Sequence, residues 1–213
     1  KLYTAEDFIE KLTAEDPYLY TLLKQCPCFG MDNEEADALA AAYAERVYMV
    51  YRNKQPKSFV DAYILTEHQF LRYEGEGLRV GATPDGRKKG EEFSKNLSPT
   101  MGMDTEGVTA LVQTLGALDS MDFPGDFPLD VMLLPYTVEG EKGLDMMKAL
   151  IYQYFDNGGF VIQFNVFDAE ELKDAQKNPH RYENLQVRIC GWNVLWNKLN
   201  TEEQNSYLEQ AKA

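Results

Sequence analysis

The stretch Phe160-Val161-Ile162-Gln163-Phe164-Asn165-Val166 is the clearest strand in this chain of 213 residues. Aromatic and β-branched residues fill it, and a nearly continuous apolar run of this length is typical of a strand covered on both faces. Gln163 and Asn165 are two residues apart, so their side chains point to one face. Two interpretations stay open for these amides: they satisfy hydrogen bonds in a core, as buried polar groups must, or they serve a site.

Helical patterns flank this strand. Before it, Glu141–Phe155 carries apolar residues at spacings of three and four and ends at Asn157-Gly158-Gly159, a common helix stop. After it, Asp168–Lys177 begins with Asp168 as an N-cap. The alternation predicts α/β organisation with four to five strands. The other predicted elements are a helix over Val108–Leu118 and strands over Phe59–Leu65, His68–Tyr73, Val131–Leu134 and Leu185–Ile189.

Helices are predicted at both ends of the chain. Thr4–Leu12 has Thr4 as N-cap and Asp7 three residues later, and Asp16–Gln25 follows at once. The final helix, Thr201–Lys212, would open with a capping box of Thr201 and Gln204. A long helix over Glu34–Arg52 would bury one stripe, made of Ala36, Leu39, Ala40, Tyr43, Ala44, Val47, Val50 and Tyr51.

Composition excludes several classes of function. The net charge of −14 would repel a phosphate backbone, so nucleic acid is not an expected partner. No run of about 18 apolar residues and no leader peptide is visible, so we expect a cytoplasmic protein without a membrane span. Three cysteines and two histidines, at scattered positions, suit neither a disulfide scaffold nor a metal site. Because the first residue is Lys1, we expect that the chain lacks its native start or is one piece of a larger protein.

A second short apolar run, Leu185–Ile189, ends at a lone glycine in Cys190-Gly191-Trp192. The pattern predicts a strand that runs into a loop whose tip is Gly191. On spacing alone, a turn is the most common role of such a glycine, because glycine tolerates positive φ and close backbone approach.

The residues around Gly191 nevertheless carry a resemblance. Arg188-Ile189-Cys190-Gly191-Trp192, preceded by Tyr182–Val187 and lying 22 residues before the last residue, resembles the C-terminal motif of glycyl radical enzymes, the family that includes pyruvate formate-lyase. The resemblance implies that Gly191 stores the radical, supported by Arg188, Cys190, Trp192 and Asn193. Glycine suits this chemistry, because the adjacent amides share the unpaired electron and no side chain keeps the α-carbon from flattening.

A second resemblance concerns a long irregular segment. Thr83-Pro84-Asp85-Gly86-Arg87, then Ser98-Pro99, Gly102-x-Asp104 and Gly107–Ala110, match a series of motifs of the same family in order, except that Val108 replaces the usual proline. The first of these is also a turn signature in its own right. The resemblance implies that the loop lines the mouth of a barrel and positions substrate. Substrate-side candidates are therefore Asp85, Arg87 and Ser98, together with Gln163 and Asn165.

The implied fold is the C-terminal part of a ten-stranded α/β barrel, with helices outside and the glycyl loop inserted into it. Residues 1–213 would form one such portion. Within it we expect a helical lead-in over 1–58, barrel strands, helices and loops over 59–180, and the glycyl radical segment over 181–213.

The implied function is radical storage for another part of an enzyme. In the family, a radical-SAM activating enzyme takes hydrogen from the glycine, and the stored radical makes a thiyl on a loop cysteine. That loop has no counterpart here: Cys190 adjoins the glycine and resembles a packing residue, and Cys26 and Cys28 precede the matching motifs.

We therefore expect a glycyl-radical subunit or fragment that acts with a larger, cysteine-bearing chain in an anaerobic bacterium or archaeon. Its chemistry on a small-molecule substrate would be of the lyase, dehydratase, decarboxylase or acyltransferase type, with no bound metal or organic cofactor. The alternatives are a spare part that repairs an oxygen-cleaved enzyme and a non-catalytic α/β binding protein.

Overall fold

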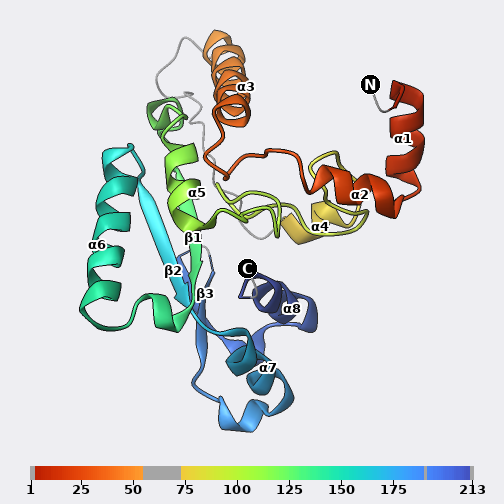
Figure 1. Cartoon of the computed structure of the whole chain (residues 1–213). Coiled ribbons are helices and arrows are strands. Elements are labelled where there is room, and N and C mark those ends of the chain that lie inside the picture. Colours follow the sequence, from red (N-terminus) through yellow and green to blue (C-terminus); the bar gives the residue numbers. More distant parts are fainter. Residues whose placement is uncertain (1–2, 55–72, 190, 212–213) are drawn as a thin grey trace.

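A computed structural model describes residues 3–54, 73–189 and 191–211 (Figure 1). Its helices are α1 (Ala5–Thr13), α2 (Pro17–Leu23), α3 (Glu34–Asn53), α4 (Tyr73–Gly77), α5 (Gly107–Leu115), α6 (Gly140–Asp156), α7 (Ala169–Lys177) and α8 (Thr201–Gln210). Its strands are β1 (Pro128–Leu133), β2 (Val161–Val166), β3 (Gln186–Ile189) and β4 (Trp192–Leu195). The seven predicted helices are confirmed to within a few residues, and β4 was not predicted. Of the strands predicted between 59 and 73, residues 59–72 lie outside the described residues and Tyr73 begins α4.

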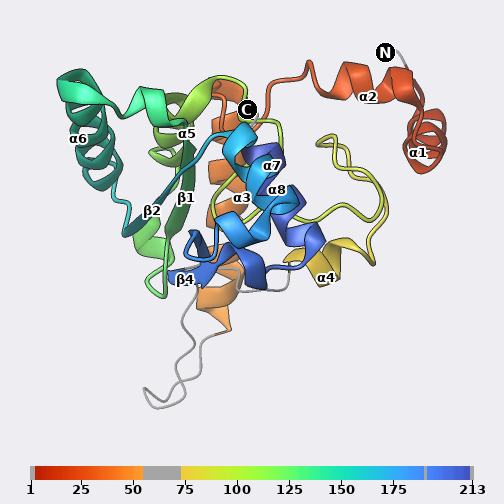
Figure 2. The same ribbon diagram turned by 90° about the horizontal axis from the view of Figure 1, so that it is seen from below.

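Strand β2 pairs in parallel with β1, so the strand predicted at 160–166 lies in a small parallel sheet. Pro128 is opposite Val161, and Leu133 is opposite Val166. Helix α6 makes the crossover between the two strands and covers one face of them. In both ribbon views α6 lies on one side of the strands and α7 and α8 lie on the other (Figures 1 and 2).

Two hydrophobic cores lie on the two faces of this sheet. The first core lies on the side of α6, where α5 and α6 pack against β1 and β2 through Leu111, Val112, Leu115, Leu129, Val131, Leu133, Leu150 and Tyr154. The other core packs α7 and α8 on the β3–β4 hairpin, through Leu172, Ala175, Val187, Trp196, Tyr207, Leu208 and Ala211. Met132 of β1 packs against this second core. The hairpin therefore rests on the face of the sheet opposite to α6.

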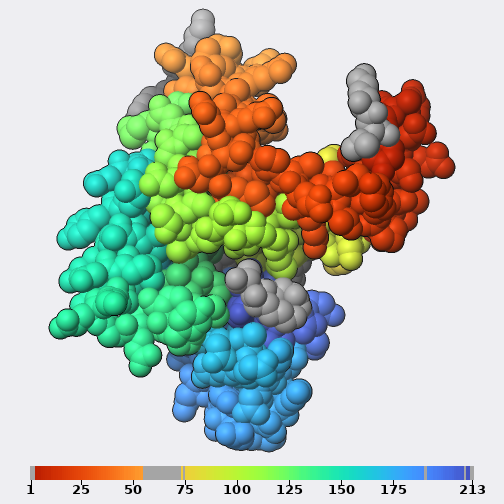
Figure 3. All heavy atoms as spheres, in the orientation of Figure 1, coloured from red at the N-terminus to blue at the C-terminus, as the bar shows by residue number. Residues whose placement is uncertain are grey.

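The stripe predicted on α3 is only partly buried. Its alanines, Val47 and Tyr51 are half-buried, but Leu39 is 73% exposed, Tyr43 71% and Val50 57%. The prediction was wrong for these three residues. The apolar spacing shows which residues share a face of the helix, but it does not show whether another element covers that face. Figure 3 shows α3 (orange) and the N-terminal helices (red) standing out from the rest of the chain. Among the described residues, no helix combines the length and the apolar content needed to cross a bilayer.

Helix caps follow the sequence at one end of the chain and not at the other. At α1, Thr4 and Asp7 form the predicted capping box. At α8 the box uses Asn200, whose Oδ1 accepts from the Glu203 N–H while its own N–H donates to Glu203, both at 2.8 Å. The predicted pair of Thr201 and Gln204 is therefore wrong by one residue, because Thr201 is already the first helical residue.

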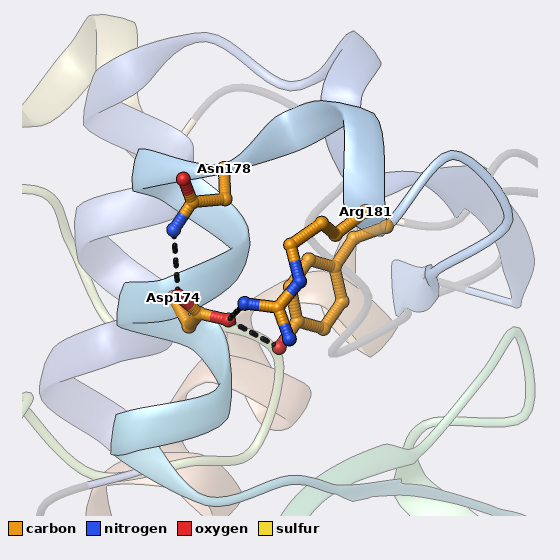
Figure 4. Close-up of polar contacts among 4 residues, drawn as sticks. Asp174, Asn178 and Arg181 are labelled. Carbon is orange, nitrogen blue, oxygen red and sulfur yellow. Dashed lines mark hydrogen bonds and ion pairs between the residues drawn. The ribbon is translucent and has the colours of Figure 1, made fainter.

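A polar cluster shapes the corner between α7 and β3 (Figure 4). The Asp174 carboxylate accepts from Asn178 Nδ2 at 2.7 Å, from Tyr182 Oη at 2.7 Å and from Arg181 Nη1 at 2.9 Å. The Tyr182 and Asn178 hydrogen bonds hold the pKa of Asp174 below its ordinary value, and the same bond from Tyr182 raises the pKa of that phenol. The cluster ties Asp174 of α7 to Tyr182, four residues before β3 begins.

We expect Asp174→Asn to lower the melting temperature at neutral pH. A carboxylate whose pKa is depressed by folding stabilises the protein above its unfolded pKa of about 3.9, and this contribution is lost as pH falls through the folded value. The difference between variant and wild type should therefore shrink below about pH 4. Thermal unfolding from pH 7 to pH 2.5 measures it, with Asp145→Asn, in an exposed ion pair on α6, as the matched control. A difference that persists at the lowest pH would show that the carboxylate charge is not the cause.

Candidate functional site

Gly191 lies at the tip of the hairpin formed by β3 and β4, residues 186–195, which we call the glycyl hairpin. Ile189 pairs with Trp192, so the connection between the strands is two residues long. Gly191 has φ +89°, a value that L residues rarely adopt and that two-residue hairpin turns commonly need. An added Cβ would meet no atom within 4 Å. Backbone conformation, and not lack of space, is what favours glycine here.

Polar side chains of β2 hold this hairpin in place. The Gly191 N–H donates to Gln163 Oε1 at 2.5 Å. The Asn165 amide accepts from the Arg188 N–H at 2.9 Å and donates to the Arg188 carbonyl at 3.0 Å, as a neighbouring strand would. Gln163 and Asn165 are 6% and 7% exposed. Their common direction was predicted correctly, and within this chain both amides bind the glycyl hairpin.

One side of the hairpin is exposed, whereas Val187 on the other side belongs to the second core. Arg188 and Asn193 form a cross-strand pair, in which Arg188 Nη1 donates to Asn193 Oδ1 at 2.9 Å. Trp192, next to the glycine, is 65% exposed. Cys190, predicted as a support of the loop, lies outside the described residues. Large aromatic side chains gain the most free energy from burial, so an exposed tryptophan beside a loop tip favours contact with another protein surface.

Of the three predicted residues in the segment 77–104, Arg87 lines neither of the cavities that Asp85 and Ser98 line. Arg87 is 2% exposed, and its guanidinium donates to backbone carbonyls of the same segment, those of Gly77, Val80, Gly81, Lys88 and Glu91. The predicted turn at Pro84-Asp85-Gly86 is confirmed, with the Gly86 N–H donating to the Thr83 carbonyl at 3.1 Å. These contacts favour an organising role for Arg87 over contact with substrate.

Asp85 and Ser98 share one cavity, and Ser98 also lines a second. Burial raises the pKa of Asp85, but hydrogen bonds from Thr100, from Thr83 and from the backbone outweigh it and leave the pKa below its usual value. Asp85 lines a cavity of about 500 Å³ between α3 and the loop. Ser98 borders this cavity too, and it also lines a cavity of about 250 Å³ with Asn165 and Lys95. Ser98 and Asn165 thus line one cavity.

Two features of the site were missed from sequence. Trp192-Asn193-Val194-Leu195 has strand composition after a two-residue turn, a hairpin signal that predicts β4. Tyr207 of α8, whose hydroxyl donates to the Arg188 carbonyl at 2.9 Å, has no signal in the sequence. Among the described residues, no group of histidine, cysteine or acidic side chains could hold a metal ion.

The site is thus a hairpin with glycine at its tip, held by two amides of β2, and comparison with known proteins names the family. A family model described as glycine radical matches residues 93–197. Trans-4-hydroxy-L-proline dehydratase of Clostridioides difficile is 34% identical over 190 residues, which cover 85% of this chain and 23% of that protein. The 4-hydroxyphenylacetate decarboxylase glycyl radical subunit of the same species is 36% identical over 138 residues, 64% of this chain and 15% of that protein.

A solved structure gives the same result. The glycerol-bound form of the B12-independent glycerol dehydratase from Clostridium butyricum superposes with a TM-score of 0.89 at 31% identity, over 98% of this chain and 27% of that chain. The chain thus carries the C-terminal domain of the glycyl radical enzyme family, in which the radical resides on a glycine. It spans about a quarter or less of the length of these relatives.

Proposed function

We propose that Gly191 is the residue that stores the radical. The observation that carries this proposal is the fixed, open position of its α-carbon: the N–H is held by Gln163, while the space around a Cβ position is empty. A glycyl α-carbon flattens when it loses hydrogen, and no described residue beyond its chain neighbours comes within 4 Å of a Cβ built there. Gly191 is also exposed, so an activating enzyme and a thiol can each reach its α-hydrogen.

The radical on Gly191 would act through a cysteine that lies in a larger chain or in a further segment of a longer protein. Within the described residues, β1 and β2 pair only with each other, so each has an open edge. Unpaired parallel edges are unusual and favour further strands that complete a barrel. The exposed apolar side of α3 is a second surface that such a partner would cover. One relative is itself described as a glycyl radical subunit.

The reaction would be radical lyase chemistry in the broad sense, a dehydration, decarboxylation or other bond cleavage in a small molecule. The relatives named above include two dehydratases and a decarboxylase. Gln163 and Asn165 would then set the position of the radical relative to substrate, while Ser98 would face the cavity that Asn165 also lines.

The test is an anaerobic EPR spectrum after incubation with S-adenosylmethionine and the cognate radical-SAM activating enzyme. We expect a doublet from the single α-hydrogen that remains on a glycyl radical. The spectrum is recorded with and without the cysteine-bearing chain, which shows whether activation needs the assembly. No doublet in either sample, with an activating enzyme that is competent on another protein, would favour a non-catalytic role.

A further inference from the structure

The Arg188 carbonyl is held from two sides. Asn165 Nδ2 of β2 donates to it at 3.0 Å, and Tyr207 Oη of α8 donates to it at 2.9 Å. These two donors fill both lone pairs of the carbonyl oxygen. Arg188 lies in β3, three positions before Gly191. The hydrogen bonds to its carbonyl therefore hold the strand that leads into the loop tip.

The ring of Tyr207 is fixed in turn by its neighbours. It meets Trp196 edge-on, with centroids 6.2 Å apart. The Lys95 ammonium lies 4.9 Å from the centroid of Tyr207 and 5.1 Å from that of Tyr73, so one cation contacts two aromatic rings.

Lys95 is also tied to the helix that carries Tyr207. Its Nζ donates to Ser206 Oγ at 2.8 Å, and that hydroxyl donates to Glu92 at 2.5 Å. Ser206 is 7% exposed and Tyr207 5%. The two adjacent residues of α8 are thereby fastened to the segment 92–95, which lines the cavity that also contains Asn165.

We propose that Tyr207 is a positioning residue of the glycyl hairpin and that Lys95 keeps its ring in place. The inference rests on the proposed role of Gly191. Gln163 and Asn165 hold the hairpin from β2, and Tyr207 holds it from the C-terminal helix. Without Tyr207, the hairpin separates from β2 more often and the loop tip spends more time away from its fixed position.

Tyr207→Phe in the assembled enzyme is the test, because it removes the hydroxyl and retains the ring with its Trp196 and Lys95 contacts. Before activation, amide hydrogen exchange in a peptide covering 186–195 should become about fivefold faster, the change that one net hydrogen bond produces. Peptides of α5 and α6 should exchange at the wild-type rate. After activation, the doublet should form and then decay faster than in the wild type.

Tyr182→Phe is the matched control. It removes a tyrosine hydroxyl from the same C-terminal unit, but that hydroxyl binds Asp174 and not the hairpin. If both variants accelerate exchange at 186–195 equally, or if neither does, the effect of Tyr207 is global or absent and the proposal is overturned. Hydrogen exchange needs no radical, so a missing doublet in the wild type would refute the role of Gly191 separately.

A second pair of variants tests Lys95. Lys95→Met removes the cation at similar length and should raise exchange at 186–195 about twofold to fivefold, since the cation–π contact of a half-buried lysine is a modest term. Lys95→Arg keeps a cation over the rings and should restore the wild-type rate. If the arginine variant exchanges as fast as the methionine variant, Lys95 does not act through the rings.

Discussion

Gly191→Ala is expected to eliminate both the EPR doublet and the turnover of the assembled enzyme while leaving it folded. A Cβ at Gly191 meets no atom within 4 Å, so the only cost to stability is the backbone strain of an L residue at φ +89°. Strain of this kind is on the order of 1 kcal/mol, well within the stability of a domain. The chemical loss is larger, because alanine adds a methyl group that resists the planar geometry of the radical centre.

Gly140→Ala separates strain from chemistry. Gly140 also has positive φ, at +70°, is exposed at the start of α6, and has open space around a Cβ. Both variants should lose a similar amount of stability in urea unfolding, and only Gly191→Ala should lose the doublet. A doublet of wild-type intensity in Gly191→Ala would place the radical on another residue and refute the proposed function.

The parallel core of the fold could be predicted from sequence because its signals are local. Continuous apolar residues over 160–166, with helical periodicity on each side, predict strand and helix without knowledge of any partner. The two amides of β2 were also placed on one face by period alone. What those amides bind was left open, because the partner, Arg188, is 23 positions away from Asn165.

The contacts around the glycine could not be predicted without the tertiary structure. Asn165 meets Arg188, and Tyr207 meets the same carbonyl, only when the hairpin has its observed register and α8 folds back on it. A shift of one residue would turn these side chains away. The burial of α3 was mispredicted for the converse reason: the sequence has the spacing of an apolar stripe, but within the described residues no surface covers Leu39 and Tyr43.

Arg87→Met is expected to destabilise the enzyme by about 3 kcal/mol, because it leaves the buried Gly77 carbonyl and the partly buried carbonyls of Lys88 and Glu91 without their charged donor. Methionine retains the length of the side chain but cannot replace the stacking of the guanidinium on Phe93, 4.6 Å from the ring centroid. Arg87→Lys should recover only part of the loss, since one ammonium cannot reach acceptors that a planar fork spans. Chemical denaturation of the assembled enzyme gives the magnitude.

Kinetics then decide between an organising role and the substrate-side role suggested by the motif. Arg79→Met, an exposed arginine of the same segment, is the matched control and should leave stability unchanged. If Arg87 only organises the loop, the surviving folded Arg87→Lys enzyme should show a nearly normal KM and a reduced active fraction. If the guanidinium binds substrate, KM should rise tenfold or more, as the loss of one charged hydrogen bond predicts, with stability little changed. The surrounding carbonyls already accept from both Nη groups of Arg87, which is why the first result is the expected one.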